Sequence, residues 1–398
     1  GRKAKDVLSS GGVDYAVTQY GYDAVGRLDC TAQRMNPAEF GSLPASACAP
    51  GTAGGDGPDR IVKNHYDAVG RANRIESAVG TADQADEVAT TFTDNGQIAT
   101  VADGKGNKTT YEYDGHDRLK KTRYPSPSTV GASSTSDYEE LGYDAGSNVT
   151  SLRKRDGRSI VYGYDGLDRV TSTTYPSGGA RAVHYSYDLR GLLTAARFDS
   201  ASGSDALLIA WDSLGRQTSS TTSLGGTSRT LSYTYDIAGN RLKIEHPDGT
   251  YAYTYHDGLN RPYYTVVNGT PVLQSYFDAQ GRMYAMDRWR ASNASWGMGT
   301  TYSYDSISRL GSQGHLFSGS GANVTTGFTH NPASQIVSRT RDNDDYRFTG
   351  FANVNRGYAV NGLNQLTGAG GATLSHDANG NLTSDGTTGY SYDVENRL

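Results

Sequence analysis

The sequence predicts an all-β protein made of tandem antiparallel β-hairpin repeats that form one long, coiled sheet. Three observations predict this class: a Tyr-Asp motif recurs at a near-constant interval, turn signals separate its copies, and the composition is rich in Gly and Tyr. A chain of 398 residues could form two or three ordinary domains, but the units of a repeat array pack only on their neighbours. We therefore expect a single repeat array over residues 1–398.

The composition favours strands with a thin, aromatic core. The chain has 50 Gly and 29 Tyr but only 4 Met, 8 Phe and 3 Trp. Its apolar share of 35% lies below the ~45–50% of typical globular domains. Disordered chains lack aromatic residues, so the many tyrosines argue against disorder. Tyrosine also suits a half-buried strand, because its ring is apolar and its tip is polar.

The motif reads Tyr-x-Tyr-Asp, then two variable residues, a small or polar residue, Arg or Asn, and an aliphatic residue. Between Asp144 and Asp278 its Asp recurs every 21 to 24 residues, and looser copies extend the array to about sixteen units. The positions to which we assign a structural role are, copy by copy, Tyr22, Asp23, Gly26 and Arg27; Tyr113, Asp114 and Arg118; Tyr164, Asp165 and Arg169; Tyr235, Asp236 and Gly239; Tyr304, Asp305 and Arg309; and Tyr392, Asp393 and Arg397. So many copies make the repeat signal strong, although any single copy is weak.

Each copy is predicted to be a hairpin. Alternating tyrosines, as at Tyr233 and Tyr235, place both rings on one face of a strand, because side chains alternate along it. The Asp ends the strand, and its carboxylate can accept hydrogen bonds from backbone N–H groups one or two residues further on. Gly, or else Asp or Asn, then supplies a positive φ angle, and Arg opens the returning strand.

A second turn signal lies between successive copies, as in Asp156-Gly157 and Asn268-Gly269. Asp-Gly and Asn-Gly between alternating strands are strong hairpin signals. Two turns in a period of about 22 residues give two strands per unit, in a continuous antiparallel ribbon. Strand twist would coil such a ribbon, and coiling into a spiral or closed shell would also pair its edges.

No pattern in the sequence predicts catalysis or a cofactor. The eight His form no metal-binding pair, and neither a nucleophile elbow nor a phosphate-binding loop occurs. The repeated Asp could be read as a carboxylate array. However, an active site needs one special place, whereas a turn role explains a residue that recurs in every unit. We therefore predict no enzyme, no catalytic residue, no metal site and no cofactor.

Charge and hydropathy limit the partners. The formal net charge is −5 with no basic block, so nucleic acid is not expected, and no apolar run approaches the ~18–20 residues of a membrane span. Exposed tyrosines could stack on sugar rings, so carbohydrate stays an alternative to packing of the tyrosines in the core. The chain starts at Gly1 and ends inside a motif at Leu398, so we expect a fragment of a larger protein, with any signal or delivery region outside it.

The copies with the order Tyr-Asp-x-x-Gly-Arg-Leu resemble RHS/YD repeats, and the resemblance covers essentially the whole chain. That family includes bacterial polymorphic-toxin shells, cocoon components of insecticidal toxin complexes, wall-associated proteins and animal teneurins. The resemblance implies a β-cocoon, a barrel-like shell of which this chain is one part of the wall. The stretch from Ser375 to Leu398 is similar to the last repeats before the family's RHS core. The Asp-Pro of the core's self-cleavage site does not occur here, so self-cleavage is assigned to no residue.

The two cysteines, Cys30 and Cys48, lie in a loop-like insertion between repeats, which we place at residues 29–62. This insertion fills the largest gap in the array, between Asp23 and Asp67. In an exported protein, which the resemblance implies, the two cysteines are expected to form a disulfide that closes the loop. Two free thiols are the alternative.

The repeats and the resemblance lead to two functional hypotheses. The first is a structural shell, secreted by a bacterium or exposed at its surface, that encloses and protects a passenger toxin or effector before delivery. A partner shell subunit or a secretion component would be a further partner. The second is a cell-surface adhesion or carbohydrate-binding module that uses the outer face of the same repeats. A third alternative is a hydrolase acting on glycans.

Overall fold

The computed structural model describes residues 2–176, 180–290, 295–317, 320–350, 353 and 355–398. Within these residues, strands account for nearly all regular structure. The helical part consists of three single 3₁₀ turns, η1 (Pro37–Glu39), η2 (Ser320–Ala322) and η3 (Asp344–Tyr346). The all-β class predicted from the two-residue periodicity is therefore confirmed.

Twenty-seven strands form one antiparallel sheet, in which each strand pairs with the next one along the chain. The first nine are β1 (Lys5–Ser10), β2 (Val13–Tyr22), β3 (Leu28–Arg34), β4 (Arg60–Tyr66), β5 (Ala72–Ser77), β6 (Ala85–Phe92), β7 (Ile98–Asp103), β8 (Lys108–Tyr113) and β9 (Leu119–Pro125). The next nine are β10 (Ser133–Tyr143), β11 (Val149–Arg153), β12 (Ser159–Tyr164), β13 (Val170–Thr174), β14 (Val183–Tyr187), β15 (Leu193–Phe198), β16 (Ala206–Trp211), β17 (Gln217–Leu224) and β18 (Thr227–Tyr235). The last nine are β19 (Arg241–Glu245), β20 (Tyr251–His256), β21 (Pro262–Val267), β22 (Thr270–Phe277), β23 (Met283–Arg290), β24 (Ser295–Tyr304), β25 (Leu310–Phe317), β26 (Val324–His330) and β27 (Ile336–Arg341).

Two kinds of turn alternate along this sheet, and each kind lies along its own edge. The Tyr-Asp turns form one edge, which we call the motif rim, and the turns between repeats form the other, which we call the connector rim. Asn268-Gly269 is a connector turn with positive φ at both residues, 49° and 77°, as its sequence predicts. The meander of hairpins follows directly from this alternation of turn signals.

Hairpins of the motif rim share one irregularity at the same place. The register shifts between the last two strand residues before the Asp, as between Gly163 and Tyr164 or between Ser303 and Tyr304. Such a bulge bends its strand and increases the right-handed twist. Because the bulges recur along one rim, their bends add up and curve the sheet.

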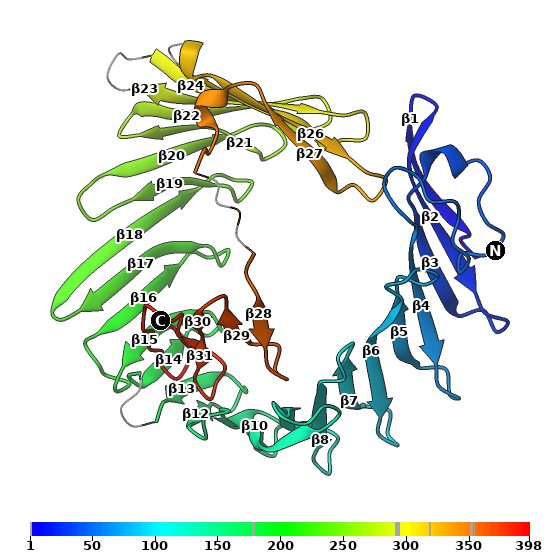
Figure 1. Cartoon of the computed structure of the whole chain (residues 1–398). Helices are drawn as coiled ribbons and strands as arrows, with labels where there is room; N and C mark the ends of the chain where they lie inside the picture. The colour runs from blue at the N-terminus through cyan, green and yellow to red at the C-terminus, as the bar shows by residue number, and fades with distance from the viewer. Residues whose placement is uncertain (1, 177–179, 291–294, 318–319, 351–352, 354) are drawn as a thin grey trace.

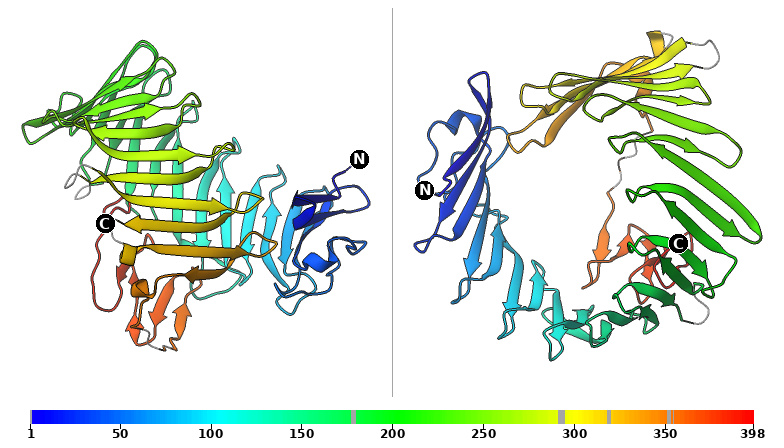
Figure 2. Two further views of the ribbon diagram at one scale, coloured as in Figure 1. Left: turned by 90° about the horizontal axis from the view of Figure 1, so that it is seen from above. Right: turned by 180° about the vertical axis from the view of Figure 1, so that it is seen from behind.

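The sheet curves into a ring-like wall whose first and last strands lie near each other (Figure 1, Figure 2). No strand ladder joins β27 to β1 in the described part of the chain, so the sheet does not close as a barrel. Instead, Gln33 Nε2 donates a 3.2 Å hydrogen bond to the Pro332 carbonyl, and the hydroxyls of Ser306 and Tyr15 lie 3.0 Å apart. We call these contacts the seam. The coiled sheet is thus confirmed, as an open ring with an unpaired edge strand at each end.

The last three Tyr-Asp turns leave this sheet. Residues 355–398, which we call the tail, form two small sheets instead. The strands are β28 (Tyr358–Val360), β29 (Leu366–Ala369) and β30 (Ala372–Thr373) in one sheet, and β31 (Ser375–His376) and β32 (Leu382–Ser384) in the other. The single ribbon expected for the whole array therefore ends at Arg341. The motif determines the hairpin and its turn, but it does not determine which strand pairs with the outer strand of that hairpin. These hairpins therefore fold without joining the large sheet.

The tail lies within the outline of the ring in Figure 1 and at one open side of it in Figure 2. Its turns bind the connector rim between β7 and β14. Asn364 Nδ2 donates a 2.8 Å hydrogen bond to Asp103 Oδ2, and Asn379 Nδ2 donates one of 2.8 Å to Asp156 Oδ2. The Tyr175 hydroxyl donates one of 3.0 Å to a Glu395 carboxylate oxygen. The tail thus follows the rim from turn to turn.

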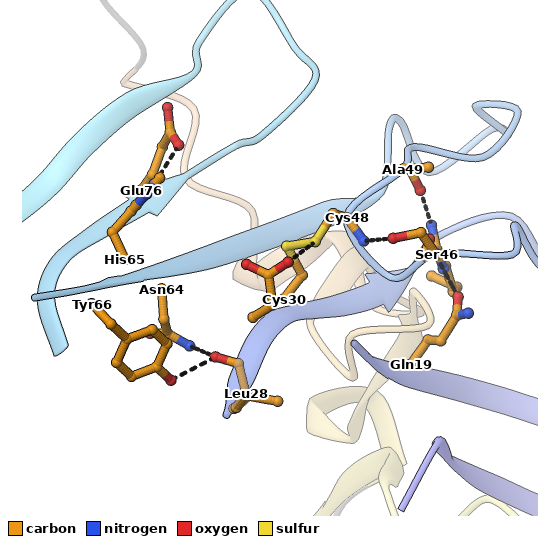
Figure 3. Close-up of a disulfide and its surroundings, with 12 residues drawn as sticks. Gln19, Leu28, Cys30, Ser46, Cys48, Ala49, Asn64, His65, Tyr66 and Glu76 are labelled. Atoms are coloured by element: carbon orange, nitrogen blue, oxygen red, sulfur yellow. Dashed lines mark hydrogen bonds and ion pairs between the residues drawn. A yellow bond between two sulfur atoms is a disulfide. The ribbon is translucent and has the colours of Figure 1, made fainter. Parts of the chain in front are cut away.

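An insertion of residues 35–59 separates β3 from β4. A disulfide joins Cys30 in β3 to Cys48 in the insertion (Figure 3). At the ends of the insertion, Arg34 Nη1 and Asp59 Oδ2 form a buried ion pair with a distance of 2.6 Å. The insertion is shorter than the 29–62 expected, since residues 29–34 and 60–62 are strand residues. Every second side chain of β3 is buried, so this strand continues the hairpin into residues that we expected to form a loop.

Candidate functional site

The Tyr-Asp turn is a compact hydrogen-bonded unit, as the copy at Asp165 shows. Its Oδ1 accepts hydrogen bonds from the backbone N–H groups of Leu167 (2.9 Å) and Arg169 (3.1 Å), and its Oδ2 accepts one from Arg169 Nε (2.8 Å). The φ angle of Asp168 is 60°. The carboxylate therefore binds groups two and four residues further on, not one and two as we expected. The turn spans the five residues from Asp165 to Arg169. It brings the backbone N–H of Arg169 within hydrogen-bond distance of the Asp165 carboxylate.

These hydrogen bonds hold the carboxyl groups in their ionised form. A hydrogen bond from Arg118 is the main cause that lowers the pKa of Asp114, to about 2. The same arrangement with Arg169 lowers the pKa of Asp165. In Asp236 the lowering comes first from the side chain of Asn240. Groups of this kind anchor turns, and they are poorly suited to exchange protons near neutral pH.

Each repeat is also tied to the next one. The guanidinium carbon of Arg169 lies 4.7 Å from the ring centre of Tyr187, the tyrosine of the following copy. The Tyr187 hydroxyl reaches back and donates a 2.7 Å hydrogen bond to the carbonyl of Val170. A guanidinium over a ring adds a cation–π attraction to this bond. We call this pair of contacts the interlock.

The interlock recurs along the motif rim. Arg27 lies 4.3 Å from the ring centre of Tyr66, and the Tyr66 hydroxyl donates a 2.7 Å hydrogen bond to the Leu28 carbonyl (Figure 3). In one copy Trp211 takes the place of Tyr, and its indole N–H donates to the Leu193 carbonyl at 2.8 Å. The substitution keeps a ring and a donor, so the hydrogen bond of the interlock survives it, while the preceding copy has Leu192 in place of the Arg.

The structure places the predicted repeat residues as follows. The carboxylate and guanidinium lie 2.7 Å apart in the pairs Asp23–Arg27, Asp114–Arg118, Asp165–Arg169, Asp305–Arg309 and Asp393–Arg397. Asp236 pairs with Asn240, and Gly26 and Gly239 both have a φ of 89°. The hydroxyls of Tyr22, Tyr113, Tyr164, Tyr235 and Tyr304 donate to backbone carbonyls of Lys3, Ile98, Val149, Gln217 and Met283. Tyr392 directly precedes Asp393 in the tail.

The structure brings these residues together within a copy and between neighbouring copies. In the described part of the chain they follow the rim, and no cleft is common to all copies, although Tyr113 and Asp114 line a local one. Sequence reasoning missed the contact that most of these arginines make with the ring of the next copy. Its signal was present, because Arg or Asn stands four residues after Asp in most copies.

The two faces of the curved sheet differ in chemistry. Residues directly opposite in an antiparallel ladder share a face, so the register defines each face from strand to strand. One face carries Leu152, Ile160, Tyr162, Leu207, Ile209, Leu231, Tyr233 and Ile244. The other carries Ser151, Arg153, Ser172, His184, Thr221, Thr230, Ser232 and Lys243 over the same strands. One face is therefore largely apolar and the other largely polar.

The apolar face looks into the ring, and we call it the inner face. The tail, which lies within the outline of the ring in Figure 1 and at one open side of it in Figure 2, borders this face in a cavity of about 490 Å³. The sheet lines this cavity with Val88, Val101, Thr109 and Tyr124, and the tail lines it with Leu363 and Gln365. The register places Thr109 on the same face as Ile160, through Tyr111, Thr122, Glu139, Leu141 and Leu152.

No metal site emerges among the described residues. One group of possible ligands, Asp29 with Cys30 and Cys48, lies close together, but both sulfur atoms are engaged in the disulfide. In the same part of the chain, no helix has the length and hydropathy needed to cross a membrane.

Comparisons with known proteins agree with this architecture. A family model described as teneurin YD-shell matches residues 56–326. A solved structure described as TcdB2-TccC3-Cdc42 is similar with a TM-score of 0.58 and 13% identity, over 96% of this chain and 26% of that one. Another, described as TcdB2-TccC3-TEV, has a TM-score of 0.54 and 14% identity, over 96% of this chain and 25% of that one. No curated protein sequence matches the chain.

The two likenesses to solved structures show the fold, and this chain spans about a quarter of the length of each of those chains. The family match extends over more than half of the chain and includes the hairpins from β4 to β25. Together with the interlocked Tyr-Asp turns, it shows that the chain belongs to the teneurin YD-shell family and forms part of a structural shell.

Proposed function

We propose that this shell segment encloses a passenger polypeptide, a toxin or effector, before its delivery. The observation that carries the proposal is the orientation of the apolar face. A sheet in water normally turns its apolar face onto a core. Here that face lines the hollow of the ring, so the hollow is the place where further polypeptide would cover it.

The inner face is suited to a polypeptide without a fixed fold. Leu207, Leu231, Tyr233 and Ile244 are half-buried side chains that form a broad surface across neighbouring strands. The tail shows that such a surface accepts chain segments with little regular structure, since it borders the inner face with strands of only two to four residues. Contact with scattered apolar side chains requires no particular sequence from the passenger.

A partner shell subunit is part of the same proposal. The similar solved structures carry TcdB2 and TccC3 together in their descriptions, and each is about four times as long as this chain. The open ring has an unpaired edge at each end, so further strands of the same or another chain would continue the wall.

We place the assembled shell outside the bacterial cell or at its surface. The disulfide between Cys30 and Cys48 supports this location, because such bonds persist in oxidising compartments.

Photo-crosslinking in the complete shell protein tests the proposal. A photoreactive amino acid is placed at Leu231 or Ile244 on the inner face, and at the neighbours Thr230 or Lys243 on the outer face as matched controls. We expect crosslinks to the passenger from the inner positions alone. Equal crosslinking from both faces, or crosslinks only to cell-surface components from the outer positions, would favour the adhesion hypothesis instead.

A further inference from the structure

Six tyrosines gather on the outer face of the sheet, over four neighbouring strands from β20 to β23. These are Tyr253, Tyr255, Tyr263, Tyr264, Tyr276 and Tyr284, which we call the tyrosine patch. The register places Tyr253 opposite Lys243, Tyr255 opposite Tyr264, and Tyr264 opposite Gln274. Since Lys243 belongs to the outer face, the patch faces away from the hollow. In Figure 1 these strands lie in the yellow-green part of the ring.

The repeat itself does not require these rings. Tyr255 and Tyr276 stand two residues before the Asp of their copies, one position away from the tyrosine of the interlock. At that position the other copies of the sheet have Gly21, His65, Thr91, Glu112, Gly142, Gly163, Ser186, Ala210, Thr234, Ser303 and Thr329. Small, polar or charged residues therefore suffice for the fold. Two consecutive copies depart from this rule in the same way.

In the same two copies, tyrosine also stands at a second position of the repeat where earlier copies have other residues. Tyr263 and Tyr284 are the bulged residues of β21 and β23, and each lies beside a tyrosine of the patch. The ring centres are 6.4 Å apart for Tyr263 and Tyr264, and 6.1 Å apart for Tyr284 and Tyr276. At the bulge of earlier copies the chain has residues such as Lys120, Thr150, Thr171 and Thr218. Two substitutions per copy in two adjacent copies build one continuous surface.

Three rings of the patch are exposed, and neighbouring rings contact one another. Tyr255, Tyr263 and Tyr284 expose 42%, 37% and 47% of their surfaces, although tyrosines of the interlock are half-buried. The ring centre of Tyr255 lies 4.8 Å from that of Tyr253 and 5.6 Å from that of Tyr264, so neighbouring rings hold one another in place. Exposed aromatic clusters of this kind mark binding surfaces more often than folding elements.

The chemistry around the patch points to a neutral ligand with apolar faces and many hydroxyl groups. Aromatic faces can stack on the C–H face of a sugar ring, while side-chain amides and carboxylates bind its hydroxyls. Gln274 and Asp287 stand opposite each other in the ladder beside the rings and offer such groups. Lys243, the cation opposite Tyr253, is paired with Glu245 at 2.9 Å, so it is not free to attract a polyanion.

We propose that the tyrosine patch is a binding surface for a neutral oligosaccharide. Its four strands extend over roughly 14 Å, at ~4.8 Å per strand, which is enough to accommodate successive linked sugar rings. The rings of Tyr255 and Tyr276 stack on the sugars, and Gln274 and Asp287 bind hydroxyls. The surface is on the opposite side of the wall from the passenger face, so the inference does not depend on the enclosing function.

Calorimetric titration of the full chain with cellotetraose, chitotetraose and maltotetraose tests the proposal. We expect at least one of the three to bind. Tyr255→Thr and Tyr276→Ser give these positions the residue types of the neighbouring copies, at Thr234 and Ser303, so the fold should accept them. Each should weaken binding about tenfold or more, as expected when one stacked ring is lost. Thr234→Ala and Ser303→Ala, at the same position of the flanking copies, should leave binding unchanged.

Thermal unfolding of each variant separates a loss of binding from a loss of structure, and unchanged midpoints are expected. Three results would overturn the proposal. The first is the absence of binding by all three sugars at millimolar concentration. The second is binding that Tyr255→Thr and Tyr276→Ser leave intact. The third is self-association of the chain in sedimentation that both variants abolish, since the patch would then be a protein interface.

Discussion

In most motif turns, the side chain of the first residue and that of the residue four positions later form a hydrogen-bonded pair, in which one donates and the other accepts. In most turns that begin with Asp, the residue four positions later is a side-chain donor, usually Arg and in some copies Asn, as in Asp236 with Asn240. Where it begins with Asn331, the later residue is Gln335, whose side-chain oxygen accepts a hydrogen bond from the Asn331 amide at 3.2 Å. Copies without a donor at this place find another one, since Arg190 binds the Asp188 carboxylate from two residues on. The turn therefore depends on complementary hydrogen bonding, and several residue pairs provide it.

Sequence reasoning covered only part of this residue-scale design. A positive φ angle and a capping carboxylate follow from residue types alone, as at Gly26 and Asp23. The approach of an Arg to the ring of the next copy, as of Arg169 to Tyr187, depends on how two hairpins stack. A single copy of the motif carries no information on that geometry.

Loss of the carboxylate of Asp305 should destabilise its turn. Asp305 accepts hydrogen bonds from the N–H groups of Ile307 (3.1 Å) and Arg309 (2.8 Å) and from Arg309 Nε (2.7 Å). Asp305→Ala should lower the free energy of unfolding by about 1–2 kcal/mol, as capping losses do. The matched control is Asp94→Ala, at an exposed position of another motif turn. Urea unfolding measures both, and equal midpoints for the two variants would contradict this role of Asp305.

Acid should weaken the rim at a defined pH. The pKa values of Asp103 and Asp114 lie at about 2 in the folded chain, below their ordinary value of 3.8. Carboxyls with a lowered pKa contribute stability that is fully present above pH 4 and is lost as the pH falls through the folded value. The thermal midpoint should therefore be constant from pH 8 to about pH 5 and fall steeply between about pH 4 and pH 2. A midpoint at pH 2.5 equal to that at pH 7 would show that these carboxylates do not support the fold.

At the scale of elements, the hairpins could be predicted and their outer partners could not. The alternation of motif turns and connector turns gave the meander, and sixteen motif turns are present in the described chain, including those at Asp377 and Asp393 in the tail. The break after Arg341 has no signature of its own, because Asn331 and Asn361 on either side both begin normal turns. Which edge a hairpin pairs with depends on the curvature of strands far away in the sequence.

The disulfide should stabilise the insertion against opening. Cys30 is fully buried in a cluster with Ala32, Ala47 and Ile61, and it is joined to Cys48 across 18 residues. Closing a loop of this size contributes roughly 3 kcal/mol, so Cys48→Ala should destabilise the first repeats by about that amount. Hydrogen exchange of β3 and β4 with and without a reducing agent measures the effect. Reduction should act on the natural chain and leave Cys48→Ala unchanged, and two alkylatable thiols in the exported protein would rule the disulfide out.

At the scale of the whole molecule, the ring results from many small bends. One bulge per motif hairpin turns the sheet slightly, and only their sum brings Gln33 within hydrogen-bond distance of Pro332. The sequence predicts that the sheet curves, but it does not predict the total angle of that curve. A small error in the bend expected for each hairpin accumulates over the array. For the same reason the seam and the position of the tail could not be predicted.

The tail is held by polar contacts that should release it when they are removed. Asn364 binds Asp103, while Asn379 binds Asp156 and accepts a 3.2 Å hydrogen bond from its backbone N–H. Each such bond contributes only about 0.5–1.5 kcal/mol net, so the double substitution Asn364→Ala and Asn379→Ala should let the tail detach while the sheet stays folded. Amide hydrogens of β29 and β32 should then exchange faster, whereas those of β8 and β12 should not.

A matched control shows whether docking is the cause. Asn260 has a φ of 61°, close to the 57° of Asn364, and it accepts a 2.8 Å hydrogen bond from Asn240 in a neighbouring turn of the motif rim, away from the tail. Asn260→Ala thus imposes the same backbone strain without touching the tail, and it should leave the exchange of β29 and β32 unchanged. If the double variant also leaves it unchanged, apolar contacts around Leu363 hold the tail on the inner face. The tail would then compete directly with a passenger for that part of the inner face, and its removal should increase crosslinking from photoreactive residues at Val101 and Thr109, which line the cavity beside it.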